Sequence, residues 1–280
     1  MSTRPAAQEF VLTDSDFDRL RGIVRDQTGI ALADSKRELV YSRLARRLRK
    51  LGLASFSEYC ALVDTGDGAE LQELTNAITT NLTSFFREKY HFEQLATEAL
   101  PQIIQSRAAA RRLRVWSAGC STGEEPYSLA MVMRETLERH SNWDIRLLAT
   151  DIDSKVVETA AAGSYTADRF AGMDPARTAR WFKNSGANGG QLTASDELKS
   201  LITFRQLNLL DAWPMKGPFD VIFCRNVVIY FDKETQRQLF DRLADIQEPG
   251  GWLFIGHSEN LFNVTNRYKL VGRTVYRRVA

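Results

Sequence analysis

A run of small residues near the middle of the chain has the composition of a ligand-binding loop. Residues 118–125 have the sequence Ala-Gly-Cys-Ser-Thr-Gly-Glu-Glu and follow a short apolar stretch, residues 113–116, that predicts a strand. Ligands of open α/β sheets bind beyond the carboxyl ends of the strands, and small residues let a ligand approach the backbone. The loop lacks G-x-G-x-x-G and the Lys-Ser/Thr of a P-loop, which disfavours pyrophosphate and triphosphate ligands. The alternative is a plain strand-to-helix turn with an acidic helix N-terminus.

Asp151 is a second candidate, because it ends the next predicted strand, residues 145–150. An acid at this position commonly accepts hydrogen bonds from both hydroxyls of a ribose, although a single strand-end Asp can also be a cap. Taken together with the small-residue loop, Asp151 indicates an adenosine-type nucleoside without a pyrophosphate.

A third group follows the strand predicted at residues 219–224, which brings Arg225, Asn226 and Tyr230 to the same edge of the sheet. Polar residues at a strand end can also simply cap the next helix. The segment lacks Asn-Pro-Pro-Tyr, the usual mark of amino-nitrogen methylation. Cys224 is not preceded by Pro, as a cytosine-C5 nucleophile would be, and we expect it to be a small core residue.

A fourth candidate, residues 81–87, lies upstream of the first strand and has the sequence Asn-Leu-Thr-Ser-Phe-Phe-Arg. Its mixture of amide, hydroxyl, aromatic and guanidinium groups is unlike a helix surface. The alternative is a helix–helix loop with two core Phe residues. Of the three His residues, only His257 is expected at a sheet edge, where we assign it a structural role.

The elements that would position these residues form two regions. Helices dominate the first 110 residues. Three capping-box patterns, which begin at Thr13, Ser35 and Ser55, predict helix starts, and Gly29 and Gly52 predict helix ends. Further helices are expected through residues 71–78 and 88–107.

Strands and helices alternate from residue 113 onward. Beyond the strands already named, they comprise a strand at 252–256, a closing hairpin at 268–279, and helices at 126–137, 154–163 and 233–246. Alternation of this kind predicts a mainly parallel, doubly wound sheet. The pattern breaks between residues 163 and 207, where a helix at 173–182, a turn-rich segment at 184–195 and a strand at 201–207 indicate an insertion beside the sheet.

Composition narrows the class of protein. The 280 residues are 44% hydrophobic and 26% charged, which is typical of a globular chain, and the net charge of +2 does not by itself indicate a nucleic-acid partner. Three Cys residues without a C-x-x-C pattern disfavour a disulfide framework or zinc site and fit a reducing cytoplasm. We expect no signal peptide and no transmembrane helix, and therefore a cytoplasmic protein.

A basic stretch stands out in the helical region. Between Lys36 and Lys50 there are five Arg residues and one acid, Glu38. Arg43, Arg47 and Lys50 share a face by i, i+4, i+7 spacing. The stretch is either a solvated face or a docking surface for an acidic helical partner.

Six blocks of the sequence carry a resemblance to a known family, and they keep its order and spacing from about residue 10 to the end. They are NLTSFFRE (81–88), VWSAGCSTGEEPYSLA (115–130), ATDID (149–153), NLL (208–210), FDVIFCRNVVIYFDK (219–233) and GHSEN (256–260). On these motifs the chain resembles the chemotaxis receptor glutamate O-methyltransferase family, CheR.

The resemblance implies a domain organisation. An all-α N-terminal domain over residues 10–90 would serve substrate docking, and residues 91–112 would form a linker helix. Residues 113–280 would form an α/β methyltransferase domain with a doubly wound, Rossmann-like sheet that binds S-adenosylmethionine. A small β-subdomain would be inserted at about 163–207.

The resemblance also implies an activity, namely transfer of a methyl group from S-adenosylmethionine to glutamate carboxylates of methyl-accepting chemotaxis receptors. The products would be glutamate methyl esters and S-adenosylhomocysteine, without a metal. The partner would be the cytoplasmic helical bundle of the receptors, and the protein would be a monomer without a stable nucleic-acid partner.

Residue roles carry over by position. Arg87 and Tyr230 match the residues nearest the transferred methyl. Docking would involve the basic residues Arg43, Arg46, Arg47 and Lys50. Cofactor binding would involve Asn81, Thr83, Arg87, Ala118, Gly119, Glu125, Asp151, Asn208, Leu209, Arg225 and Asn226.

Two other functions remain open from the sequence. An RNA or small-molecule methyltransferase could use the same cofactor and the Arg-rich face for phosphate. A receptor-binding adaptor could keep the cofactor only as a signal, although the presence of Arg87 and Tyr230 argues against it.

Overall fold

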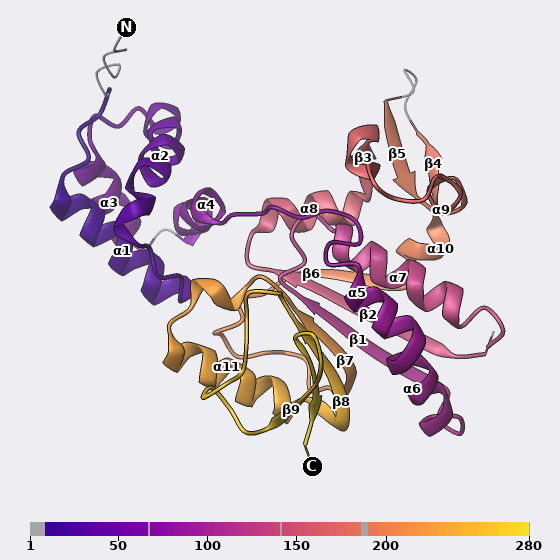
Figure 1. The fold of residues 1–280 in the computed structure, drawn as a ribbon. Coiled ribbons are helices and arrows are strands. Elements are labelled where there is room, and N and C mark those ends of the chain that lie inside the picture. The colour runs from indigo at the N-terminus through magenta and orange to yellow at the C-terminus, as the bar shows by residue number, and fades with distance from the viewer. Residues whose placement is uncertain (1–8, 67, 141, 186–189, 280) are drawn as a thin grey trace, which may run out of the picture. The chain divides into compact units, whose positions relative to one another are not determined.

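The computed structural model describes residues 9–66, 68–140, 142–185 and 190–279 (Figure 1). The chain divides into two compact units, residues 1–80 and residues 81–280. No helix in the described ranges has both the length and the apolar character needed to cross a membrane.

The first unit is helical. Its elements are α1 (Asp14–Thr28), the 3-10 turn η1 (Asp34–Lys36), α2 (Arg37–Leu51), α3 (Phe56–Asp64) and α4 (Gly68–Ile78). Apolar side chains from all four α-helices form one buried cluster, which includes Leu20, Leu44, Phe56 and Leu74. The unit therefore has a core of its own, as the helical spacing of these residues predicts.

The capping boxes and glycine stops predicted for the helix ends are partly confirmed. The capping box of Thr13 and Asp16 is present, and Gly29 ends α1 in a left-handed conformation. Ser55 caps α3 by accepting from the backbone N–H of Glu58, while the Glu58 side chain accepts from Ala54 N at 2.8 Å.

The capping box predicted at Ser35 is wrong. Ser35 lies inside η1, and the residue that precedes α2 is Lys36, which makes no side-chain cap. An N-cap residue needs a non-helical backbone, so a residue inside a helical turn cannot fill this position.

A seven-stranded sheet forms the centre of the second unit, with strand order β6-β2-β1-β7-β8-β10-β9. The parallel strands are β6 (Ile202–Gln206), β2 (Asp144–Asp151), β1 (Arg112–Ala118), β7 (Phe219–Cys224) and β8 (Gln247–Ile255). The closing hairpin, β9 (Tyr268–Gly272) and β10 (Val275–Arg278), is antiparallel. The predicted fold class is thereby confirmed.

Helices cover the sheet on both faces. One face packs against α7 (Glu124–Thr136) and the helical run α5 (Tyr90–Gln94), η2 (Leu95–Ala99) and α6 (Leu100–Ser106); the other packs against α11 (Lys233–Asp245). Successive strand residues point to opposite faces, so Val115 and Trp116 enter different apolar clusters. A further helix, α8 (Ser154–Ala162), connects β2 to the smaller sheet.

The helical run at residues 90–106 belongs to the second unit. Phe92, Leu95 and Ala99 are buried in the cluster that also contains Val115 and Phe223 of the sheet. The segment was predicted to be a linker helix over residues 91–112, but burial of its apolar face makes it a layer of the α/β unit.

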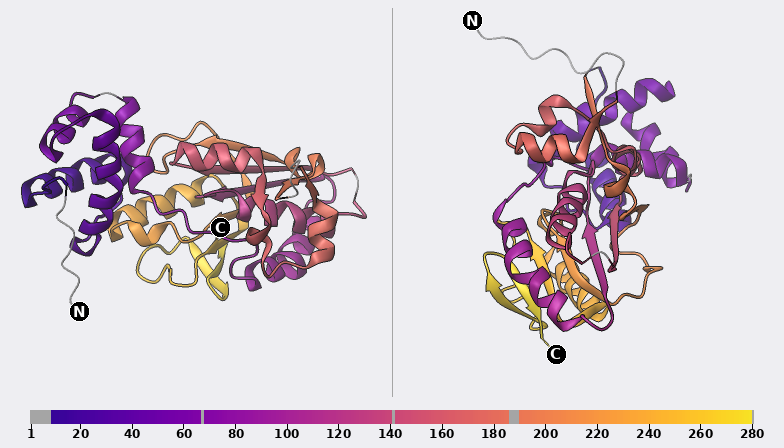
Figure 2. Two further views of the ribbon diagram at one scale, coloured as in Figure 1. Left: turned by 90° about the horizontal axis from the view of Figure 1, so that it is seen from above. Right: turned by 90° about the vertical axis from the view of Figure 1, so that its right-hand side faces the viewer.

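A second, three-stranded antiparallel sheet lies beside the main one (Figures 1 and 2). It consists of β3 (Ser164–Thr166), β5 (Gln191–Ala194) and β4 (Phe182–Asn184), in that order. Three short helical segments accompany it, namely η3 (Ala167–Phe170), α9 (Pro175–Trp181) and α10 (Asp196–Lys199). Part of the predicted turn-rich segment, residues 186–189, lies outside the described residues.

The inserted segment ends earlier than residue 207. Residues 202–206 form β6, which pairs in parallel with residues 147–151 of β2 at the edge of the main sheet. This strand was predicted as part of the insertion because its own sequence does not reveal its pairing partner.

Candidate active site

The carboxyl ends of β1, β2, β7 and β8 meet at one edge of the main sheet. The loop after β1 begins at Gly119, Asp151 ends β2, Arg225 follows β7, and His257 follows β8. Residues 81–88 approach the same edge through the contacts described below.

Two glycines shape the loop after β1. Gly119 has φ of +86°, and a Cβ atom there would lie 2.3 Å from Cγ2 of Val227. Gly123 has φ of +101° at the start of α7, and a Cβ atom there would lie 2.6 Å from the hydroxyl of Tyr165. Only glycine fits both the left-handed backbone and the close approach, so the chain passes very near its neighbours.

Asp151 organises this loop. One carboxylate oxygen accepts from Ser121 N at 2.8 Å and the other from Asp153 N at 3.0 Å, and burial raises the pKa of the group. The structure therefore shows the cap that was the alternative interpretation. Each oxygen retains acceptor capacity for a further donor such as a ribose hydroxyl.

The segment from Asn81 to Glu88 lies along the same loop. The Asn81 amide donates to Asp153 at 2.8 Å, its carbonyl accepts from the Ser121 hydroxyl at 3.0 Å, and the Thr83 carbonyl accepts from Arg169 at 3.2 Å. The packing of its two Phe side chains into aromatic clusters agrees with the alternative interpretation, a loop with two core Phe residues, while the cofactor role of the segment stays a prediction.

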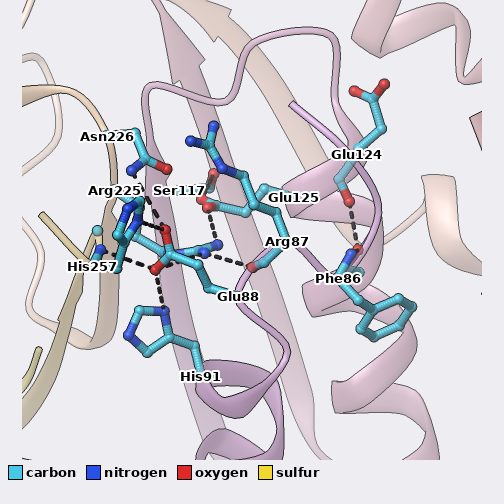
Figure 3. Close-up of polar contacts among 12 residues, drawn as sticks. Phe86, Arg87, Glu88, His91, Ser117, Glu124, Glu125, Arg225, Asn226 and His257 are labelled. Carbon is cyan, nitrogen blue, oxygen red and sulfur yellow. Dashed lines mark hydrogen bonds and ion pairs between the residues drawn. The ribbon is translucent and has the colours of Figure 1, made fainter. Parts of the chain in front are cut away.

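Arg225 connects three parts of the site (Figure 3). Its side chain is buried, and one terminal nitrogen of the guanidinium donates to Glu125 at 2.9 Å. The other terminal nitrogen donates to the Arg87 carbonyl at 2.5 Å and lies 3.3 Å from a Glu88 oxygen. Ser117 holds the second oxygen of Glu125 at 2.8 Å. The Nε atom of Arg225 is buried without a hydrogen-bond partner among the described residues, which leaves one donor for a ligand.

Glu88 is the residue that sequence reasoning missed. Its carboxylate accepts from the His257 ring at 2.8 Å and from the His257 backbone N–H at 3.1 Å (Figure 3). Burial opposes its ionisation, but the His257 hydrogen bonds and the charge of Arg225 outweigh burial and lower its pKa to about 2. Its position next to Arg87, at the end of the block NLTSFFRE (81–88), was the available signal.

A second residue without a predicted role, His91, is fully buried below Glu88. Its Nε2 atom lies 3.2 Å from the Arg273 carbonyl and 3.0 Å from the Thr274 hydroxyl. Burial, with the nearby charge of Arg225, lowers its pKa to about 4, so the ring is neutral near pH 7. His257, by contrast, has a side chain that is 63% exposed.

The remaining site residues lie on segments that reach this edge. Arg87 and Tyr230 are half-buried; Arg87 donates to the Leu82 carbonyl at 2.8 Å, and Tyr230 lies in the 3-10 turn η4 (Val228–Tyr230). Asn226 has φ of +57°, and Ala118 is buried at the end of β1.

Asn208 and Leu209 follow β6, next to the end of β2. The Leu207 N–H donates to the Asp151 carbonyl at 2.8 Å, which places the segment beside the candidate ribose acid. Asn208 accepts from Leu210 N at 3.0 Å and stabilises a turn, while Leu209 is buried.

The four predicted docking residues differ in their surroundings within the first unit. Arg43 donates to three carbonyls at the end of α4, and Arg47 forms ion pairs with Glu70, which is buried, and with Glu73. Arg46 and Lys50 are exposed. The shared face expected to be free for docking is therefore occupied by α4 at the two Arg positions.

Among the residues that the structure describes, no group of three or more His, Cys, Asp or Glu side chains is arranged to hold a metal ion.

The doubly wound sheet, with a small-residue loop after β1 and an acid at the end of β2, is the arrangement expected of an enzyme that binds a nucleoside cofactor. Residues 81–277 match the family model described as CheR methyltransferase, SAM binding domain, and residues 15–79 match CheR methyltransferase, all-alpha domain. The chain belongs to the CheR family.

Related proteins align with this chain over nearly its full length and theirs. The chain is 46% identical over 273 residues to chemotaxis protein methyltransferase 2 of Pseudomonas aeruginosa, covering 96% of this chain and 95% of that protein. It is 42% identical over 273 residues to the chemotaxis protein methyltransferase of Escherichia coli K12, covering 96% and 92%. A solved structure, magnesium protoporphyrin IX methyltransferase from Synechocystis PCC 6803, aligns over 69% of this chain and 68% of that one, but with 16% identity and a TM-score of only 0.31.

These matches make the protein an S-adenosylmethionine-dependent methyltransferase of chemotaxis. The site residues fit this ligand, since a close glycine loop, a buried acid with spare acceptor capacity and a buried donor of Arg225 lie at one sheet edge.

Proposed function

We propose that the enzyme transfers the methyl group of S-adenosylmethionine to glutamate carboxylates in the cytoplasmic helical bundle of chemotaxis receptors. The products are glutamate methyl esters and S-adenosylhomocysteine, no metal takes part, and the enzyme acts as a cytoplasmic monomer. The observation that carries the proposal is the convergence of Asn81, Gly119, Asp151 and Arg225, each matching a cofactor position of the family, at one edge of the sheet.

The cofactor roles follow from the groups available at this edge. Asp151 accepts the ribose hydroxyls, and Asn208 with Leu209 flanks the adenine. The amino-acid part of the cofactor would lie near the backbone of Gly119 and near Arg225, whose Nε atom is buried without a hydrogen-bond partner among the described residues. The other proposed contacts come from Asn81, Thr83, Arg87, Ala118, Glu125 and Asn226.

The chemistry requires little acid–base assistance. S-adenosylmethionine, when bound, supplies an electrophilic methyl on a sulfonium. A glutamate side chain has an unperturbed pKa of roughly 4.3, so it is already an ionised nucleophile near pH 7 and needs no general base. Alignment and removal of water from the carboxylate then supply most of the rate.

Arg87 and Tyr230 are the proposed catalytic residues. The Arg87 guanidinium orients the incoming carboxylate by a two-pronged contact. A contact that is too strong would stabilise the ground state, so Arg87 positions the carboxylate more than it neutralises it. Tyr230 packs beside the methyl and donates to one carboxylate oxygen.

The first unit supplies the docking surface in this proposal. Arg46 and Lys50 are exposed on α2 and would meet the acidic methylation helices of the receptor. Arg43 and Arg47 hold α4 in place and so support this surface from beneath.

The decisive experiment incubates the enzyme with labelled S-adenosylmethionine and cytoplasmic receptor fragments. We expect base-labile label in the fragments, and loss of turnover by about a hundredfold or more in Arg87→Ala with the fold retained. Tyr230→Phe should slow transfer less than Tyr230→Ala, because the ring remains. Base-stable label, or label in RNA rather than receptor, would overturn the proposal.

A further inference from the structure

The carboxylate of Glu88 is the centre of a polar cluster that the proposed function does not use. Besides His257 and Arg225, it is approached by the Asn226 amide at 3.5 Å and by Nδ1 of His91 at 3.5 Å (Figure 3). The Tyr90 hydroxyl donates to it at 3.2 Å. Its own side chain is 10% exposed. The donors come from β7, β8 and α5 and their flanking segments, so one carboxylate joins three parts of the α/β unit.

The backbone around Arg87 needs such support. Phe86 has φ of +54° and Glu88 has φ of +58°, so Arg87 lies between two non-glycine residues in the left-handed region. This conformation is unfavourable for side chains with a Cβ and persists only when surrounding contacts impose it. The contacts are those of Phe86 N with the Ser128 hydroxyl at 3.0 Å, of the Arg87 carbonyl with Arg225, and of the Glu88 carboxylate.

We infer that Glu88 is a positioning residue for methyl transfer, because its carboxylate, held by His257 and Arg225, fixes the backbone from which Arg87 acts. The inference rests on the proposed role of Arg87. It assigns to His257 the role of a second support, reached from the end of β8.

Arg225 links the Glu88 carboxylate to the Arg87 backbone. The same guanidinium holds the Arg87 carbonyl, the Glu88 carboxylate and Glu125 at the start of α7. Loss of the Glu88 charge would leave Arg225 paired with Glu125 alone, and the Arg87 carbonyl would lose a fixed donor. The loop after β1 would keep its own contacts, since Asp151 and not Glu88 holds it.

A carboxylate suits this position better than an amide. Two ionised oxygens accept from several donors, whereas Gln offers one acceptor oxygen and would direct its own NH₂ at donors. Glu88→Gln therefore keeps the shape of the side chain but removes the charge and half of the acceptors. Glu93→Gln is the matched control, because Glu93 is an exposed acid on α5, the helix that follows Glu88, and pairs with Lys89.

The test measures kcat, KM, S-adenosylhomocysteine affinity and Tm for Glu88→Gln, His257→Ala and Glu93→Gln. We expect kcat to fall about tenfold or more in Glu88→Gln and severalfold in His257→Ala, with product affinity within about threefold of wild type. Glu93→Gln should match wild type. A purely structural role would instead lower Tm and the active fraction without changing kcat per folded enzyme.

Coupling to Arg87 separates this inference from the proposed function. If Glu88 acts through Arg87, Glu88→Gln should not lower further the residual rate of Arg87→Ala, measured by long incubation with labelled cofactor. Full activity of Arg87→Ala would reject the proposed catalytic role itself. Two outcomes would overturn the inference alone. One is reduced activity of Arg87→Ala together with a wild-type kcat in Glu88→Gln. The other is that Glu88→Gln lowers the rate by the same factor in the wild type and in Arg87→Ala. If Glu88→Gln does not fold, His257→Ala, which removes an exposed ring, provides the same comparison.

Discussion

At the residue scale, the site depends on charged groups that hold chain segments together before any ligand is bound. Arg225 and Asp151 show this in opposite ways. Arg225 distributes its donors over Glu125, Glu88 and the Arg87 carbonyl, while Asp151 collects backbone N–H groups from two loops. Preorganised groups of this kind do not need to reorient when the substrate arrives.

Asp151 should show both a structural and a ligand-binding role. In Asp151→Asn the amide oxygen can still accept from one backbone N–H, but the charge available to the ribose is lost. We expect the binding free energy of S-adenosylhomocysteine, measured by calorimetry, to weaken by about 1.5–3 kcal/mol in Asp151→Asn and by at least as much in Asp151→Ala. Unchanged affinity in both variants would remove the ribose assignment.

His91 should make stability depend on pH. Burial and the charge of Arg225 lower its pKa from 6.5 to about 4, so the unfolded chain binds more protons than the folded one between these values. The free energy of unfolding should therefore be highest above the unfolded pKa and fall as the pH is lowered from 6.5 toward 4. The lowered pKa of Glu88 adds a further loss between 4.5 and about 2.

The measurement is Tm against pH for wild type and for His91→Gln. The curve of His91→Gln should be flatter between pH 6.5 and 4, because its side chain does not titrate. His140→Gln, which changes an exposed His, should follow wild type. Parallel curves for wild type and His91→Gln would contradict the assignment.

At the scale of elements, α2 has one face packed on α4 and another that is exposed. Arg43 and Arg47 attach it to α4, whereas Arg46 and Lys50 face outward. The basic stretch is therefore partly internal structure and partly surface, and the sequence spacing alone does not distinguish the two.

Reversing the charge of Arg47 should lower the stability of the protein more than reversing the charge of Arg46. Arg47→Glu places a carboxylate against the buried Glu70, and breaking a buried ion pair typically costs about 3–5 kcal/mol. Arg46→Glu makes the same change of charge on the exposed face and should alter Tm little. Chemical unfolding of both variants tests this, and equal stabilities would show that the Arg47–Glu70 pair does not hold α4.

At the scale of the whole molecule, the chain consists of a helical unit with its own core and an α/β unit that contains every proposed cofactor residue. Both units match the CheR family, at residues 15–79 and 81–277. Under the proposed function, variants in the helical unit should therefore affect docking of a protein substrate without affecting binding of the cofactor.

Salt should affect the reaction on receptor fragments through the exposed part of α2. Arg46→Glu combined with Lys50→Glu should keep S-adenosylhomocysteine affinity but lower kcat/KM, since an acidic partner would meet like charge. Exposed charges are screened over roughly 8–10 Å at physiological ionic strength, so kcat/KM of the wild type should fall with salt more steeply than that of the variant. Equal rates with parallel salt curves would mean that this face is only solvated.

The sequence alone was sufficient for most features whose determining interaction is local, with the capping box expected at Ser35 as an exception. The capping box at Thr13, the left-handed stop at Gly29 and the buried strand at residues 219–224 depend on neighbours within a few positions, and all three are present. The family resemblance, which carried the enzyme class, likewise depends on motifs whose order along the chain is visible without a fold.

Tertiary structure decided the features that depend on residues far apart in the chain. Glu88 and His257 are separated by 169 positions, Arg47 and Glu70 by 23, and the partner of β6 is β2. Long-range pairing, burial and the resulting pKa shifts arise only when each unit has folded and water is excluded from its interior. For that physical reason the cluster around Glu88 and the internal role of Arg43 and Arg47 became visible only in the folded chain.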